Sequence, residues 1–215
     1  MFKKLGFILF ITLIALTVKA SSKLDNFEGS IKLKKETVYD TSYVLIQVSG
    51  NRVRLDEYDS KKNVTSIYII NLESQKVLAL SPQRKLFYEL SPSRSIQIPN
   101  DDAAIINKEN TIVLEGQSCC QMRVKNIARD TEVAYWVTER DFDFFLAMNK
   151  ILRKVKPDID LFNSFPDVKG LFPMLAVERT LLRKEKMKII VTAINESKLN
   201  DNIFTVPLGY QKIVQ

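Results

Sequence analysis

Short runs of alternating apolar and polar residues follow one another along most of the chain. Between residues 30 and 90 these runs are rich in Val, Ile, Tyr and Phe, recur about every ten residues and are separated by polar turn clusters. In the first run Ile31 and Leu33 fall on one side of the strand, and Lys32 and Lys34 fall on the other. The pattern predicts an antiparallel meander. Its strands are expected at residues 30–37, 42–49, 52–56, 64–71, 76–80 and 86–90.

A second set of strand-like runs begins after a less regular stretch. Residues 91–109 contain Pro92 and Pro99, and we expect a long loop there with at most a short helix near residues 103–107. Further strands are predicted at residues 111–115, 119–128, 132–138, 174–182 and 186–194, with an extended apolar segment and a Pro/Gly-punctuated turn at 203–210. In total the pattern predicts about eleven strands in a mainly β, α+β fold.

One segment has the periodicity of a helix. Apolar residues from Phe142 to Val155 fall on two adjoining helical stripes, which form an unusually wide apolar face. Thr138 and Asp141 have the spacing of an N-terminal capping box, and Pro157 ends the pattern. Such a helix, inserted late in a sheet protein, either plugs its own core or forms a lid over a ligand cavity. The sequence leaves both alternatives open.

The first twenty residues have the composition of a secretory signal peptide. Lys3 and Lys4 precede an apolar run that ends in Val18-Lys19-Ala20, so we expect cleavage after Ala20. An uncleaved anchor is the alternative, but the run is shorter than the ~18–20 apolar residues that span a bilayer. The mature chain, residues 21–215, then has about 195 residues and is expected to form a single domain.

Charge and the absence of histidine restrict the function. Removal of Lys3, Lys4 and Lys19 with the signal lowers the formal net charge from +7 to +4, and the remaining cations alternate with acidic residues. A nucleic-acid partner is therefore not expected. Without histidine, Ser-His-Asp catalysis and His-ligated metals are excluded, and only carboxylate, Lys or Tyr chemistry remains for an enzyme. We expect a binding protein with no catalytic residues, no metal and no cofactor.

The two cysteines of the chain are adjacent, Cys119 and Cys120. A disulfide between neighbours needs a distorted peptide, although an exported protein reaches a compartment that permits disulfides. Adjacent side chains of a strand point to opposite faces, so we expect one buried thiol and one near solvent. Two cysteines without histidine do not complete a tetrahedral zinc site on their own.

Four groups of short motifs are distributed over nearly all of the mature chain. They are Phe27-Glu28-Gly29-Ser30-Ile31, Gly50-Asn51-Arg52-Val53-Arg54, Gly116-x-x-Cys119 with Tyr135-Trp136-Val137-Thr138, and Phe204-x-Val206-Pro207-x-Gly209-Tyr210. In these motifs the chain resembles an exported bacterial family of unknown function within the LolA/LolB-like superfamily of lipoprotein carriers. Cys120 departs from the family pattern, which matches at Cys119 alone.

The resemblance implies an open, strongly curved antiparallel sheet, a half-barrel whose concave apolar face is partly closed by helices. Carriers of that shape hold acyl chains. An open sheet has to cover its apolar concave side, and either a ligand or an apolar helix can do so. The segment from Phe142 to Val155 is the expected cover. Because the shared motifs have the composition of turn and core positions, the resemblance supports the fold more strongly than the function.

The candidate ligand-binding residues follow from this picture. They are Trp136, Phe142, Phe145, Leu146, Met148, Ile151, Arg52 and Arg54. Tyr135 and Trp136 are neighbours on a predicted strand, so one should belong to the core and the other to a rim, where Trp suits a ligand or membrane edge. Arg52 and Arg54 share one strand face, and they either meet solvent, tie down the lid or bind a head group.

The expected function is non-covalent binding of an apolar ligand, most plausibly a lipid or lipoprotein acyl chain. The protein is expected to act as a monomer in the periplasm or after secretion, without a transmembrane span in its mature form. An alternative is a structural or protein-interaction module of the envelope, with a self-filled barrel and a protein partner. A histidine-independent enzyme is the weaker alternative. A large apolar cavity would favour the ligand carrier, and a filled core with an exposed apolar patch would favour the interaction module. A polar cleft with converging carboxylates would favour the enzyme.

Overall fold

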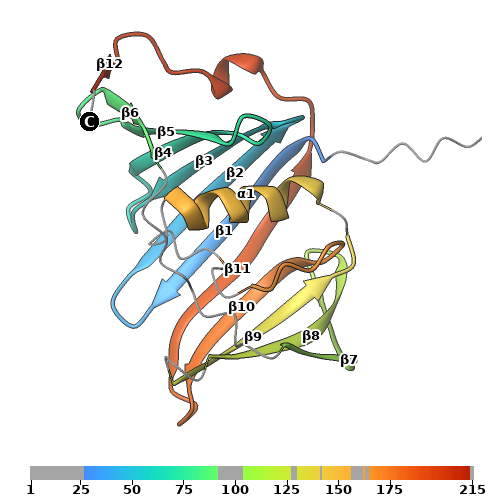
Figure 1. The fold of residues 1–215 in the computed structure, drawn as a ribbon. Coiled ribbons are helices and arrows are strands. Elements are labelled where there is room, and N and C mark those ends of the chain that lie inside the picture. Colours follow the sequence, from blue (N-terminus) through green and yellow to red (C-terminus); the bar gives the residue numbers. More distant parts are fainter. Residues whose placement is uncertain are drawn as a thin grey trace, which may run out of the picture.

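A single curved sheet contains every strand that the structure describes. The structure is a computed structural model that describes residues 27–91, 104–126, 130–140, 142–155, 162 and 165–213. The sheet has twelve strands in the order β12-β6-β5-β4-β3-β2-β1-β11-β10-β9-β8-β7 and does not close into a barrel (Figure 1). The predicted signal peptide, residues 1–20, and the capping residue Asp141 lie outside the described residues.

The strands and helices have the following bounds. They are β1 Gly29–Thr37, β2 Thr41–Ser49, β3 Arg52–Tyr58, β4 Val64–Asn71, β5 Lys76–Ser81, β6 Leu86–Glu89, β7 Ala104–Leu114, β8 Gln117–Asn126, β9 Thr131–Thr138, α1 Asp143–Val155, β10 Phe172–Thr180, β11 Glu185–Glu196, the 3-10 helix η2 Asp201–Phe204 and β12 Gln211–Lys212. None of the helices in the described part of the chain is long and apolar enough to cross a bilayer.

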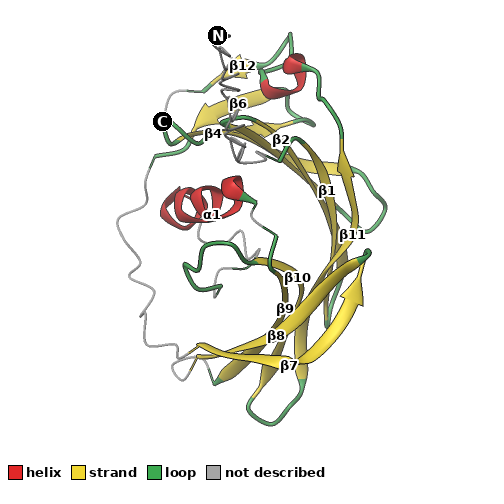
Figure 2. Cartoon of the chain, turned by 90° about the vertical axis from the view of Figure 1, so that its right-hand side faces the viewer, coloured by secondary structure: helices red, strands yellow, loops and turns green. Residues whose placement is uncertain are grey.

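Two antiparallel meanders meet at the centre of the sheet. The first runs from β1 to β6 and the second from β7 to β11, and β1 pairs with β11 to join them. The sheet curls strongly, so that α1 stands inside its concave side (Figure 2). This architecture confirms the predicted mainly β, open half-barrel with one late helix, and β12 brings the expected eleven strands to twelve.

Two predictions along the chain were wrong. Residues 103–107 were expected to form at most a short helix, but residues from Ala104 onward form β7, which pairs with β8 at the edge of the sheet. Pairing with β8 stabilises an extended backbone that local sequence alone does not specify. The segment 203–210 was expected to be extended and to end in a turn; the turn lies at residues 208–209, but Ile203 and Phe204 belong to η2, with Asn200 accepting a hydrogen bond from the amide of Asn202 as its cap.

Both faces of the sheet bury apolar side chains. On β4, Tyr68 and Ile70 belong to the large core of the concave face, whereas Ile67 and Ile69 belong to a smaller cluster on the convex face. Alternation along a strand explains the division. The C-terminal segment, residues 201–213, covers the convex cluster, to which it contributes Val206 and Tyr210.

Gly29, from the first motif, lies at the junction of the two meanders. Its backbone has φ +153°, and a Cβ placed there would lie 2.1 Å from the carbonyl oxygen of Asn195 in β11. No side chain fits at that distance, so glycine permits the close approach of β1 to the end of β11.

Candidate functional site

The concave face under α1 is the candidate site. The helix begins with Asp143 in its first turn and ends with Arg153 and Lys154 in its last, charges that the helix dipole favours at those ends. Its apolar face is turned to the protein interior. The buried residues of this face are Phe144, Phe145, Met148, Asn149, Ile151 and Leu152.

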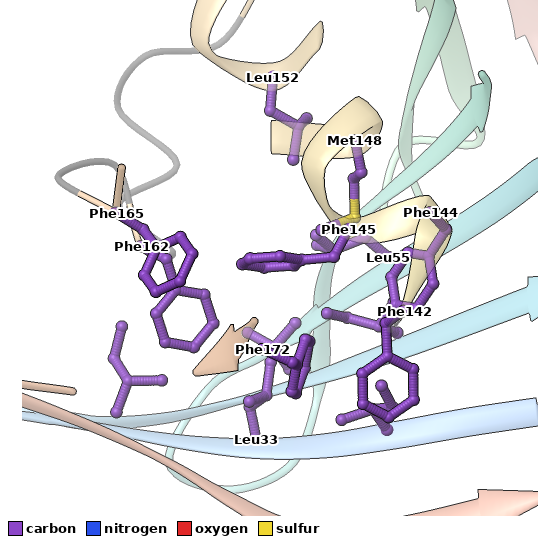
Figure 3. Packing of buried hydrophobic residues seen from close by; sticks show 14 of the residues in the cluster. Leu33, Leu55, Phe142, Phe144, Phe145, Met148, Leu152, Phe162, Phe165 and Phe172 are labelled. Carbon is purple, nitrogen blue, oxygen red and sulfur yellow. The ribbon is translucent and has the colours of Figure 1, made fainter. Parts of the chain in front are cut away.

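Six aromatic rings from the start of the helix, the helix itself, the segment after it and the sheet form what we call the aromatic cluster: Tyr135, Phe142, Phe145, Phe162, Phe165 and Phe172. Figure 3 labels the phenylalanines of this cluster. The ring of Phe145 lies at its centre, with centroids 4.9 Å from Phe172, 5.5 Å from Phe165 and 5.8 Å from Phe162. Most pairs meet edge to face, the geometry that aromatic quadrupoles favour. The cluster therefore joins α1 to β9 and β10 through specific ring contacts.

The helix fills the space that it covers. Phe145 is 2 % exposed and Met148 is fully buried, and both pack in the same core as Leu33 and Leu55 of the sheet. In this structure α1 is thus a plug. A ligand on this part of the concave face would have to displace the helix or part of the aromatic cluster.

Charged side chains fix the two ends of α1. Arg153 donates to Asp167 Oδ1 at 3.0 Å and to the carbonyl oxygen of Phe165, and Lys150 lies 3.4 Å from Asp167. Before the helix, Arg140 pairs with Glu196 of β11 and lies 4.9 Å from the ring centroid of Phe142. The C-terminal half of α1 is therefore tied to the segment that follows it, and its start is tied to the sheet.

The structure brings together the helical members of the predicted site. Phe142, Phe145, Met148 and Ile151 are buried in the concave core, and Leu146 is half-buried. Trp136 is also half-buried and packs at the margin of this core.

Arg52 and Arg54 are not brought to α1. They alternate with Val53 and Leu55, which belong to the concave core, and so face the convex side. Arg54 pairs with the buried Asp56 at 2.7 Å and donates to the carbonyl oxygen of Ile203 at 2.9 Å. Arg52 pairs with Asp201 at 2.6 Å. Both arginines therefore attach η2 to β3.

Four aromatic members of the cluster were not among the predicted site residues: Tyr135, Phe162, Phe165 and Phe172. Tyr135 is 1 % exposed and its ring centroid lies 5.1 Å from that of Phe165, so Tyr135 is the core member of the Tyr-Trp pair. Phe165 and Phe172 lie outside the helix, and helical periodicity gave no signal for them. The alternation of β9 could have identified Tyr135, because Val133 and Val137 share its buried side.

The adjacent cysteines border a second, more polar site. Both thiols are free: Cys119 is buried, and Cys120 is partly exposed. Burial raises the pKa of the Cys119 thiol above its ordinary value. Cys120 lines an open pocket of about 570 Å³ beside the start of α1. The other residues of this pocket are Thr111, Gln117, Ser118, Val137, Thr138, Glu139 and Arg140.

The sequence of residues 27–210 matches the family described as Domain of unknown function (DUF4412). The chain belongs to this family. The match confirms the resemblance to a family of unknown function. Several motif residues of this DUF4412 chain have structural roles, since Gly29 permits the β1–β11 approach and Val206 and Tyr210 cover the convex cluster.

Solved structures share the fold of the chain at low sequence identity. An uncharacterized conserved protein from Thermus thermophilus has a TM-score of 0.53 and 9% identity, with 87% of this chain and 91% of that chain covered. A chain of the Pseudomonas aeruginosa MucA/MucB complex has a TM-score of 0.50 and 10% identity, with 86% of this chain but only 58% of that chain covered. A domain from Vibrio parahaemolyticus, described as an outer membrane lipoprotein-sorting protein, has a TM-score of 0.31 and 8% identity over 82% of this chain and 87% of that chain. A comparison with curated proteins finds no significant match.

Proposed function

We propose that the protein binds the acyl chain of a lipid or lipoprotein non-covalently on the concave face, and that α1 moves to admit it. The observation that supports this proposal is the composition of the helix–sheet contact. The helix side of this contact packs on apolar side chains of the sheet through Phe142, Phe145 and Met148. An acyl chain can replace contacts of this kind, since apolar burial is non-directional and contributes about 25 cal/mol per Å².

The proposal includes an extracytoplasmic location, in the periplasm or outside the cell. The predicted signal peptide would direct the protein there, and an envelope lipid ligand would be found there. The neighbouring fold of MucB, found in a complex with MucA, favours a second candidate. In that alternative the protein is an envelope module that binds another protein, and α1 remains a permanent plug. The complete burial of Phe145 and Met148 is compatible with it.

Native mass spectrometry of the protein, exported to a Gram-negative periplasm and purified without detergent, tests the proposal. We expect an adduct of acyl-chain mass, and we expect added cis-parinarate to accept energy from Trp136, the single tryptophan. A clean apo mass together with no uptake by the folded protein would reject the acyl-chain proposal and favour the protein-binding module.

A matched pair of variants locates the uptake. Phe145→Asp places a carboxylate in the aromatic cluster and should abolish uptake, whereas Ile69→Asp places it in the convex cluster and should not. If either variant fails to fold, Phe145→Ala and Ile69→Ala replace the pair. Phe145→Ala should then tighten binding, because an apolar cavity takes up apolar ligands. Equal effects of the two substitutions would contradict a concave site.

A further inference from the structure

Two buried hydrogen-bond donors without partners lie on one face of α1. Asn149 is 4 % exposed, and among the described residues its Nδ2 has no hydrogen-bond partner. Four residues later, Arg153 Nε is also buried and unpartnered, although the two terminal nitrogens of Arg153 bind Asp167 and the carbonyl oxygen of Phe165. Residues at this spacing are neighbours on a helix surface.

The neighbours of Asn149 along its face of α1 are largely apolar. Phe145, at the centre of the aromatic cluster, precedes Asn149 by one helical turn, and the buried Leu152 follows it. A buried amide without a partner costs about 1–3 kcal/mol of folding free energy, and a leucine of similar shape avoids that cost. An asparagine here is thus unfavourable in the unliganded protein and becomes favourable when an acceptor oxygen arrives.

We propose that Asn149 Nδ2, with Arg153 Nε beside it, binds the carboxylate or ester carbonyl oxygen at the end of an acyl chain. This inference rests on the proposed acyl-chain binding on the concave face and specifies which end of the ligand α1 recognises. Both unpartnered groups are donors, so they match an acceptor oxygen. Lys150 and Arg153 both pair with the single carboxylate of Asp167, so this group of described side chains carries one net positive charge, which favours an anionic or carbonyl-bearing ligand.

Three probes of equal chain length test the inference on the exported full-length protein. They are oleate, methyl oleate and 1-octadecene, each titrated against Trp136 fluorescence in competition with cis-parinarate. Oleate should bind about tenfold more tightly than the hydrocarbon, the size of one buried hydrogen bond, and methyl oleate should do the same if the carbonyl oxygen is the acceptor. A preference for oleate alone assigns the carboxylate, and similar affinities for oleate and its ester assign the carbonyl oxygen.

Two variants separate a specific donor from general charge. Asn149→Leu should remove the preference for oxygen-bearing probes and raise the thermal midpoint of the unliganded protein. Lys154→Leu changes an exposed residue of the same helix and removes a positive charge, and it should leave the preference unchanged.

The outcomes distinguish this inference from the proposal on which it rests. Equal binding of all three probes by the wild-type protein, or an unchanged preference in Asn149→Leu, overturns the inference and leaves acyl-chain binding intact. Binding of none of the probes rejects acyl-chain binding itself.

A different observation points to a membrane contact. The β1–β2 turn exposes Val38 and Tyr39, at 62 % and 96 %, and the β10–β11 turn exposes Leu181 and Leu182, at 57 % and 93 %. Thr37 pairs with Met187, so these two turns lie at the same end of adjacent hairpins (Figure 1). Single exposed apolar residues are ordinary, but four on neighbouring turns mark an interaction site.

The charges around these turns select the partner. Arg183, Lys184 and Lys186 of the β10–β11 hairpin are all exposed, and Arg183 and Lys184 form no ion pair with the described residues. An apolar tip flanked by cations, as in the β10–β11 hairpin, fits the surface of an anionic bilayer, where apolar side chains enter the headgroup region and cations meet lipid phosphates. We infer that these hairpin tips dock on an anionic phospholipid membrane.

Flotation with vesicles tests the docking. The protein should float with vesicles of phosphatidylethanolamine and phosphatidylglycerol and should bind phosphatidylcholine vesicles more weakly. Leu181→Ser/Leu182→Ser should reduce binding about tenfold, whereas Leu208→Ser, at another fully exposed leucine, should leave it unchanged. Wild-type protein that does not float, or equal losses in the two variants, would overturn the inference.

Discussion

The two faces of the sheet are covered by different means. On the concave side, α1 packs through Phe145 and the rings around it. On the convex side, the C-terminal segment is attached to the sheet by backbone hydrogen bonds, with Gln211 donating to the carbonyl oxygen of Lys85 and Ile213 to that of Phe87. It is also attached to β3 by Arg52 and Arg54.

Under the proposed function, the difference predicts which cover a ligand displaces. Backbone and ion-pair contacts are directional, and a ligand that enters between the partners leaves polar groups unsatisfied. Aromatic and aliphatic contacts can be exchanged for an acyl chain of similar area. Under the proposed function the aromatic cover is the one that a ligand replaces, since the ion pairs of Arg140 and Arg153 lie at the ends of α1 and its contact with the core is apolar. The polar attachments of the C-terminal segment are made directly to β3 and β6.

The largest expected effect is the loss of the central ring of the concave cover. Phe145→Ala should lower the free energy of unfolding by about 3–5 kcal/mol, and Ile69→Ala in the smaller convex cluster by about 2 kcal/mol. Urea denaturation followed by circular dichroism measures both. Comparable losses would mean that the concave aromatic cluster contributes no more to stability than the smaller convex cluster.

A smaller loss is expected when the convex cover loses its buried attachment. Arg54→Met leaves Asp56, which is 5 % exposed, without its cation and removes the bond to Ile203. We expect a loss of about 2–3 kcal/mol, together with faster hydrogen exchange in residues 201–213. The double variant Arg54→Met/Asp56→Leu should recover part of the stability because no unpaired charge remains. Unchanged exchange in the single variant would show that η2 is held by other contacts.

The exposed arginine should matter less. Arg52 pairs with Asp201, whose side chain is 76 % exposed, so Arg52→Met should lower stability by about 0–1 kcal/mol. Hydrogen exchange should speed up less in this variant than in Arg54→Met. If Arg52→Met had the larger effect, the contact of Arg52 with the ring of Phe204 would be the main attachment of η2.

Local patterns predicted the elements well and the long-range contacts poorly. Alternation gave most strands, and helical periodicity gave α1, because each depends on burial of one face. The first half of β7, before the predicted strand at residues 111–115, and the 3-10 helix η2 were missed. The first half of β7 depends on pairing with β8, and η2 on contacts with β3, which is distant in sequence. At the site, the helix side was predicted from Phe142, Phe145 and Met148. The rings that meet it from β9, β10 and the segment after α1 come from elements whose order in space the sequence does not specify.

The modification rates of the two adjacent cysteines report opening of the concave core without any substitution. Cys119 belongs to that core and Cys120 lines the open pocket. Because burial raises the pKa of the Cys119 thiol, a smaller fraction of Cys119 is thiolate in the folded protein than of an ordinary thiol at a pH near 8 or 9. Cys120 should therefore react with iodoacetamide about tenfold faster or more. If α1 is the replaceable cover, an acyl-chain ligand that displaces it should accelerate modification of Cys119 selectively, as peptide mass mapping would show. Equal reactivity of both thiols in the unliganded protein would mean that the concave core opens readily without a ligand. The concave and convex covers would then differ in how often they open as well as in the kind of contact that holds them.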